Sequence, residues 1–218
     1  SSTYITPTLS VQLAYKSKGY KFFSKGAYNL NVFGIRNNSN QAGKFDDKVG
    51  VIYVDDSNKP HVHLWDATTD PGIHWLSNPL NKDGTAIMLK GQYRGAYKLG
   101  IHGRTWASGG YDALEQVKPM KYIRDNNKDD KLDFSLAENE ENIIEDILKT
   151  NIHRASKWKL LQYIGKYSAG CQVIRSIEDF NLLISLCRKQ ILRGHGNSFT
   201  YTLFDSYDVF KNNWKNFI

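Results

Sequence analysis

The sequence predicts a mostly β domain with a few helices, in the α+β class. Segments rich in Val, Ile, Tyr and Phe, with partial alternation, recur through residues 21–135, and helical periodicity is confined to a few stretches. Of the 218 residues, 40% are hydrophobic and 13% aromatic, which is enough for one sizeable core. We expect a single domain over 1–218, with a helical segment at 1–20, the β-rich part at 21–135 and a further part at 150–205.

The N-terminal segment is expected to be a helix. Thr6 can cap a helix over 6–18, Pro7 suits its first position and Gly19 can end it. Strand-like sequence follows because aromatic and β-branched residues then alternate with polar ones. The expected strands are 20–23, 27–36 and a hairpin of 49–54 with 61–66 around the polar turn D-D-S-N-K-P.

The middle of the chain predicts more strands around an irregular, aromatic stretch at 71–84. These strands are 86–93, 95–103 and two short ones within 113–124, which Pro119 separates. The acidic stretch 139–149 is either a short helix or an insertion.

The last part of the chain gives the strongest helix prediction, over 177–193 and ending at Gly194. Cys187 lies on the apolar stripe of this helix and is expected to be buried. A strand at 199–204 follows, and the chain closes with an aromatic, basic tail.

The formal net charge is +7 and the pI is near 9.2. Basic proteins bind nucleic acids, anionic membranes or anionic cell-wall polymers. The basic residues are spread along the chain without a Lys/Arg-rich run, so no nucleic-acid partner is expected. No stretch of about twenty apolar residues predicts a membrane span. No signal peptide is visible and no cofactor is expected.

One stretch carries the pattern of a cysteine nucleophile. His153 in N-I-H-R-A-S precedes S-A-G-C, which ends at Cys171. In such an enzyme the thiolate attacks, the imidazole takes and returns the proton, and backbone N–H groups hold the oxyanion. Ser168 would shape the turn or the oxyanion pocket, or be an ordinary turn serine. The N–H groups of Gly170 and Cys171 are the expected oxyanion donors, and a nearby helix N-terminus is expected to lower the pKa of the thiol.

This pattern resembles the catalytic signature of the L,D-transpeptidase (YkuD-like) family, in which a His is followed by S-x-G-C. The resemblance covers roughly residues 150–187, and the matching residues are His153, Ser168, Gly170, Cys171 and, more loosely, Asp179. Val173 stands where the family usually has Arg or Asn. The resemblance implies a β-sandwich or barrel with insertions, a His Nδ1 held by a backbone carbonyl, and a thioester formed on peptidoglycan stem peptides.

Other polar residues are candidates for substrate binding. Arg154 and Arg175 would receive a substrate carboxylate, or be ordinary surface arginines. Gln172 would offer a hydrogen bond beside the nucleophile. His102 is a second candidate base or pocket residue, or has a structural role, and Tyr93 would flank the substrate.

Two patterns suggest metals. His61 and His63 form H-x-H on an expected strand, so both side chains face one side and would bind zinc with a third ligand, although no H-E-x-x-H is present. A calcium loop with oxygen ligands at every second residue is the other possibility, and a solvated acidic turn is its alternative. The candidate ligands are Asp125, Asn127, Asp129 and Asp133.

These observations together predict a peptidoglycan-active cysteine enzyme: an L,D-carboxypeptidase or endopeptidase, or a transpeptidase. Its place would be the cell envelope or a phage particle, and a lytic role as a phage endolysin or virion-associated lysin is favoured. Two alternatives remain open. One is a non-catalytic phage structural or binding protein on the same fold, and the other is a zinc hydrolase that uses His61 and His63.

Overall fold

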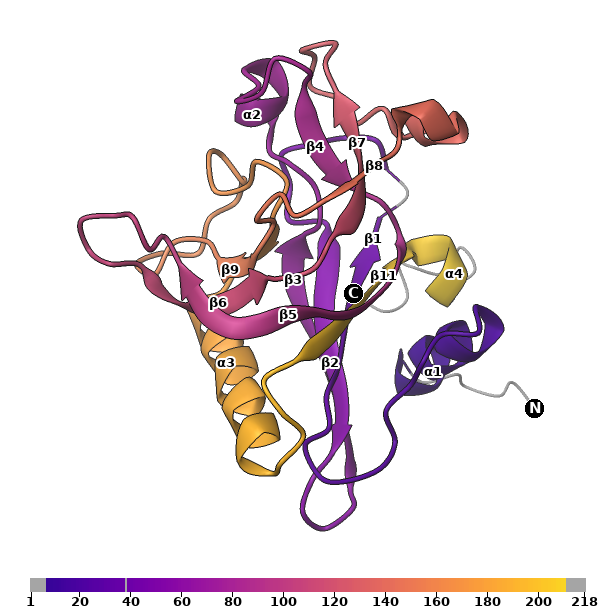
Figure 1. Ribbon diagram of the computed structural model, residues 1–218. Helices are drawn as coiled ribbons and strands as arrows, with labels where there is room; N and C mark the ends of the chain where they lie inside the picture. The colour runs from indigo at the N-terminus through magenta and orange to yellow at the C-terminus, as the bar shows by residue number, and fades with distance from the viewer. Residues whose placement is uncertain (1–6, 38, 211–218) are drawn as a thin grey trace.

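The computed structural model describes residues 7–37 and 39–210, and it has a mostly β architecture (Figure 1). The main sheet closes into a barrel in the order β1-β11-β5-β6-β9-β10-β3-β2, and a smaller sheet has the order β4-β7-β8. In Figure 1 the small sheet lies above the barrel, and the long helix α3 lies at its lower left. The predicted α+β, mostly β class is confirmed.

The elements have the following bounds. The barrel strands are β1 (Asn31–Arg36), β2 (Asp47–Val54), β3 (Pro60–Thr68), β5 (Gly91–His102), β6 (Tyr111–Gln116), β9 (Ile152–Arg154), β10 (Gln172–Ile174) and β11 (Phe199–Asp205). The small sheet has β4 (Thr85–Met88), β7 (Met120–Asp125) and β8 (Ile144–Asp146). The α-helices are α1 (Pro7–Ser17), α2 (Ile73–Ser77), α3 (Ile177–Leu192) and α4 (Ser206–Phe210), and two short 3₁₀ turns are η1 (Phe134–Glu138) and η2 (Glu140–Asn142).

The barrel joins strands that are far apart in sequence. Most neighbours are antiparallel, including the predicted hairpin of β2 and β3, but β1 pairs in parallel with β11 and β9 pairs in parallel with β10. The barrel therefore takes strands from both the 21–135 part and the 150–205 part of the chain. A parallel pair needs a long connection, and the 17 residues 155–171 provide it between β9 and β10.

Helix α3 packs its apolar face onto the main core. Phe180, Leu183 and Cys187 belong to the core cluster that also holds the inward residues of the barrel strands. The Oγ of Ser176 caps the helix by accepting the N–H of Asp179, and Gly194 follows the helix end with a φ of +83°. The predicted second helix and the burial of Cys187 are confirmed.

The predicted first helix is also confirmed as α1, and Gly19 follows it with a φ of +67°. The proposed cap Thr6 lies outside the described residues, as does the tail beyond Phe210. The two short strands around Pro119 and the last strand, β11, agree with the prediction.

Several expected elements differ. No strand forms at 20–23, because the backbone there bonds to side chains: the N–H of Lys21 to Gln92 and the N–H of Phe23 to Asn31. The first half of 27–36 is irregular, and β1 begins only at Asn31. A short helix, α2, stands in the stretch expected to be irregular.

Two further boundaries were predicted wrongly. Strand β5 continues past Gly95 as one long strand, although Gly95 itself has a φ of +59°, and the break falls between β4 and β5 instead. The acidic stretch 139–149 forms neither a helix nor a plain insertion, since it contributes a 3₁₀ turn and the edge strand β8. Within the described residues no helix is long and apolar enough to cross a membrane.

Candidate active site

The parallel pair β9–β10 brings the predicted His and Cys to one place. His153 in β9 lies opposite Val173 in β10, and Cys171 precedes Val173 by two residues. Because side chains alternate along extended chain, Cys171 and His153 point to the same face. The paired strands therefore present on one face two groups that are 18 residues apart in the sequence.

A backbone carbonyl fixes the imidazole of His153. Its Nδ1 lies 2.9 Å from the carbonyl oxygen of Arg154. A carbonyl only accepts hydrogen bonds, so Nδ1 carries the hydrogen and Nε2 keeps a free lone pair. The hydroxyl of Tyr111 lies 3.3 Å from the same Nδ1 and donates to the same carbonyl at 3.3 Å. His153 is thus held as the tautomer whose Nε2 can accept a proton.

A second histidine, His102, packs against the ring of His153. The ring of His102 stacks on that of His153 with centroids 4.0 Å apart and planes 13° apart. The side-chain oxygen of Asn151 accepts the N–H of Gln116, so its amide nitrogen is the end that meets Nδ1 of His102, at 3.1 Å. Nδ1 of His102 therefore accepts, and in the neutral ring its hydrogen sits on Nε2.

Burial keeps both reacting groups neutral. It lowers the pKa of His153 to about 3, with His102 as a further cause, and the bond to the Arg154 carbonyl opposes this only in part. It raises the pKa of the Cys171 thiol to about 11, although the N–H of Asn151 acts in the opposite direction. At neutral pH the pair is therefore thiol and imidazole, with His153 placed as a general base.

The expected effect of a helix N-terminus on Cys171 is wrong. Strand β10 follows Cys171 directly, and helix α3 begins only at Ile177. The dipole effect falls off within the first turn, so it does not offset the burial of the thiol.

Ser168 shapes the turn before the nucleophile. It is fully buried, its Oγ accepts the N–H of Gly170 at 3.2 Å, and it lies 3.0 Å from the carbonyl oxygens of Asp70 and Cys171. Its hydroxyl contacts lie within this turn and on the backbone of Asp70, so it acts as a positioning residue. Gly170 has a φ of +124°, and a Cβ there would lie 2.7 Å from the carbonyl oxygen of Ala86.

The hydrogen bonds of this turn leave only one of the two predicted oxyanion donors. The N–H of Gly170 is already used by Ser168, so it does not point at a substrate oxygen. The N–H of Cys171 has no acceptor within the described residues, and it is the donor that remains for an oxyanion.

The segment before β9 carries residues that the sequence did not single out. Lys149 has a φ of +60°, an uncommon conformation for a residue with a Cβ. Its neighbour Thr150 forms hydrogen bonds with three side chains, those of Gln116, Tyr97 and Tyr122. The Sγ of Cys171 approaches the Lys149 carbonyl at 3.8 Å, so this strained segment forms one wall beside the thiol.

A cleft of about 570 Å³ opens on the His153 side. Histidines 102 and 153 and Tyr111 lie at its base, and two loops form its walls, 103–110 and 155–167. Arg154 lies in the cleft with its guanidinium 3.9 Å above the ring of Tyr111. The predicted binding residues Arg154 and His102 therefore line the same cleft as His153.

Three other predicted binding residues lie elsewhere. Gln172 is fully buried, and its amide bonds to the carbonyl of Thr69 and the hydroxyl of Tyr201. Arg175 donates to the carbonyl of Leu161 and lines a separate hollow. Tyr93 donates to the carbonyl of Leu89 on the barrel. None of these side chains lines the His153 cleft.

The looser family match at Asp179 lies in the first turn of α3 and lines the same separate hollow as Arg175. It does not meet His153 or Cys171 through any interaction among the described residues.

The proposed zinc pair is present without a third ligand. His61 and His63 stack on β3, but Nε2 of His61 bonds to Asp55 and Nε2 of His63 to the hydroxyl of Tyr53. Over 7–37 and 39–210, no three His, Cys, Asp or Glu residues are grouped to hold a metal ion.

In the proposed calcium loop, side-chain oxygens accept backbone N–H groups of the loop itself. Asp125 accepts the N–H of Asp133, Asn127 that of Asp129, and Asp129 that of Lys131. These contacts are those of a turn stabilised by its own side chains, but Asp125 is buried rather than solvated.

The chain matches no protein-family model, no curated protein and no solved structure. The argument about its function therefore depends on the geometry of this site.

The sequence missed Tyr111, Asn151 and Gln116, which position the two histidines. Asn151 lies two residues before His153, so strand alternation would have placed its side chain on the same face. No local signal marks Tyr111 or Gln116, because both come from a strand that meets β9 only in the folded barrel.

Proposed function

We propose that this protein is a cysteine enzyme that acts on the stem peptides of peptidoglycan. The observation that carries the proposal is the fixed tautomer of His153, a residue on the same face of the sheet as Cys171. The substrate class comes from the resemblance of the H…S-x-G-C pattern to the L,D-transpeptidase signature. Such an enzyme acts at the cell envelope or from a phage particle.

The reaction starts from a neutral pair. Nε2 of His153 takes the thiol proton as Sγ attacks the substrate carbonyl, and the oxyanion accepts the N–H of Cys171. The carbonyl of Arg154 stabilises the imidazolium through Nδ1. The C–N bond then breaks, His153 returns the proton to the leaving amine, and a thioester remains. Water or a second amine attacks the thioester and restores the thiol.

Mass spectrometry of digested peptidoglycan and purified muropeptides tests this proposal. We expect new fragments with the wild type and a loss of activity of at least about 10³-fold in Cys171→Ala, because no other group can form the thioester. Cys187→Ala is the matched control, since it removes a buried thiol outside the site and should keep the activity. The mass change tells hydrolysis from transfer.

Identical, unchanged profiles from wild type and Cys171→Ala would contradict an enzyme. They would favour a structural or binding protein that keeps this fold without turnover, a role with which the neutral, partly buried thiol is also compatible.

A further inference from the structure

The position of the His153 cleft determines which part of a substrate it can hold, provided that the proposed cysteine mechanism is correct. The imidazole that takes the thiol proton must return it to the leaving amine, so the leaving group lies on the side of His153. Two hollows are lined by residues that lie close to Cys171 in the sequence or on the strand paired with β10. Ala169 and Thr150 line one of about 280 Å³, and His153 and Tyr111 line the other, of about 570 Å³. The larger hollow is therefore on the leaving-group side.

The charge of this cleft is one-sided. Arg154, Lys157 and Lys166 line it and no acidic side chain does. Within the described part of the chain, none of the three has a carboxylate within ion-pair distance. Apart from the carbonyl of Ala155, the guanidinium of Arg154 bonds to no acceptor there, although it is held over Tyr111. A set of cations without carboxylate partners suits a carboxylate ligand.

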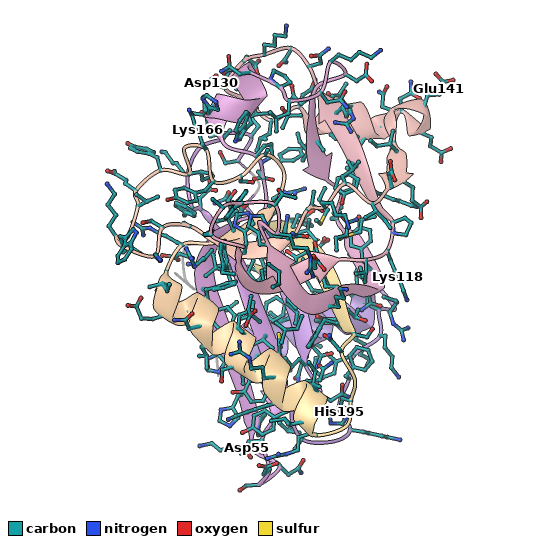
Figure 2. The ribbon with its side chains drawn as sticks, turned by 60° about the vertical axis from the view of Figure 1, so that its left-hand side comes forward. Asp55, Lys118, Asp130, Glu141, Lys166 and His195 are labelled. Atoms are coloured by element: carbon teal, nitrogen blue, oxygen red, sulfur yellow. The ribbon has the colours of Figure 1, made fainter. Side chains whose placement is uncertain are left out.

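The size of the cleft and its aromatic walls indicate a ligand longer than one amino acid. Trp106 on one loop is 52% exposed and Trp158 on the other is 84% exposed, and both line the cleft. Sites of about 300–1,000 Å³ hold whole small-molecule ligands, and this cleft falls within that range. Figure 2 places Lys166 in the upper half of the molecule, far from the end marked by Asp55 and His195.

We propose that this cleft binds the leaving-group side of the substrate as a peptide of two or more residues with a free carboxylate. The enzyme then cuts within a peptide rather than removing one terminal residue. The C–N bond of the scissile amide breaks as the C–S bond forms, and the thiol proton passes through His153 to the departing peptide amine. Arg154 receives the carboxylate, while Trp106 and Trp158 cover the peptide chain.

The test compares substrates with the same acyl part and different leaving groups: one D-amino acid, a tripeptide acid and the same tripeptide amide. We expect kcat/KM to be highest for the tripeptide acid and about 10-fold or more lower for the amide, because a charge-assisted hydrogen bond is lost. Arg154→Gln keeps the backbone carbonyl that holds His153, and it should remove the difference between acid and amide.

Two lysine variants serve as a matched pair in the same loop. Lys166→Gln, inside the cleft, should reduce the preference for the acid a few-fold. Lys159→Gln makes the same charge change in the adjoining hollow, at a residue that does not line the cleft, and should retain the preference.

The outcomes separate this inference from the proposed function. If Cys171→Ala is inactive but the wild type prefers the single residue, or cuts acid and amide equally, the mechanism stands and the inference is wrong. If no substrate is turned over, the proposed function fails. The tripeptide acid and amide are then titrated into the wild type by Trp fluorescence. Tighter binding of the acid supports the cleft assignment, and equal or absent binding overturns it.

Discussion

Two stacked histidine pairs lie in the described part of the chain, and only one of them suits the proposed acyl transfer. His102 and His153 stack at 4.0 Å with planes 13° apart, and His61 and His63 stack at 6.5 Å with planes 12° apart. Each pair also has a tyrosine hydroxyl bonded to one of its rings. Residue types alone therefore do not distinguish the two.

The difference lies in what holds each ring. In the first pair a backbone carbonyl accepts the N–H of Nδ1 of His153, which leaves Nε2 free on the face of the sheet that also bears Cys171. In the second pair both Nε2 atoms are already bonded, to Asp55 and Tyr53, and no nucleophile or third metal ligand is grouped with them in the described residues. A histidine becomes a base when its other nitrogen is fixed and its lone pair is left free.

The largest contrast is expected from removing one imidazole from each pair. His153→Gln should lower kcat by about 10²–10⁴-fold, because general base catalysis is lost. His63→Gln should leave kcat within a few-fold of the wild type. Turnover of muropeptides measures both. Loss of activity in the His63 variant, or on chelation with EDTA, would instead favour the zinc hydrolase.

The labelling rate of Cys171 tests the neutral pair. With a thiol pKa of about 11, iodoacetamide should label it about 100-fold more slowly at neutral pH than an ordinary thiol, and the rate should rise about tenfold per pH unit. Mass spectrometry of the modified peptide follows the reaction. Fast labelling with a midpoint below pH 7 would indicate a thiolate–imidazolium pair. Slow labelling of the free enzyme is thus no sign of an inert cysteine.

The two tyrosines give a smaller contrast. Tyr111→Phe removes a hydroxyl that contacts both His153 and the Arg154 carbonyl, and we expect kcat to fall about 10-fold because the imidazole is held less firmly. Tyr53→Phe removes the matching hydroxyl from His63, 3.1 Å away, and should leave kcat unchanged. Equal effects of the two substitutions would contradict the assignment of His153 as the base.

The smallest contrast concerns how the free energy of unfolding depends on pH. The pKa of His153 is lowered to about 3, so between about pH 3 and 6.5 the unfolded chain binds a proton that the folded chain does not. The free energy of unfolding should therefore fall as the pH falls, by up to about 1.4 kcal/mol per pH unit from this group.

His153→Gln should flatten this acid-side slope in urea unfolding between pH 4 and 8. His63→Gln should change it less, because burial lowers the pKa of that partly exposed ring by a smaller amount. An unchanged slope in the His153 variant would mean that the ring is not held neutral.

Local patterns were sufficient for the elements that depend on near neighbours. The helix over 177–193 has its cap, apolar stripe and terminating Gly within one segment, and it forms as predicted. The β2–β3 hairpin is equally local. The stretch 20–23 reads as a strand yet forms none, because the side chains of Asn31 and Gln92 take its backbone bonds.

Composition and periodicity by themselves predicted the mostly β class and the buried Cys187, and both are confirmed. A short motif predicted the pairing of His153 with Cys171, which stays a prediction. Only the tertiary structure decided the pKa values and hydrogen-bond partners of these groups. The supporting residues Tyr111, Gln116 and His102 come from strands that meet β9 through long-range pairing. Burial shifts the pKa values of His153 and Cys171, and hydrogen bonds leave the N–H of Cys171 without an acceptor in the described residues. Both effects exist only once the barrel has closed.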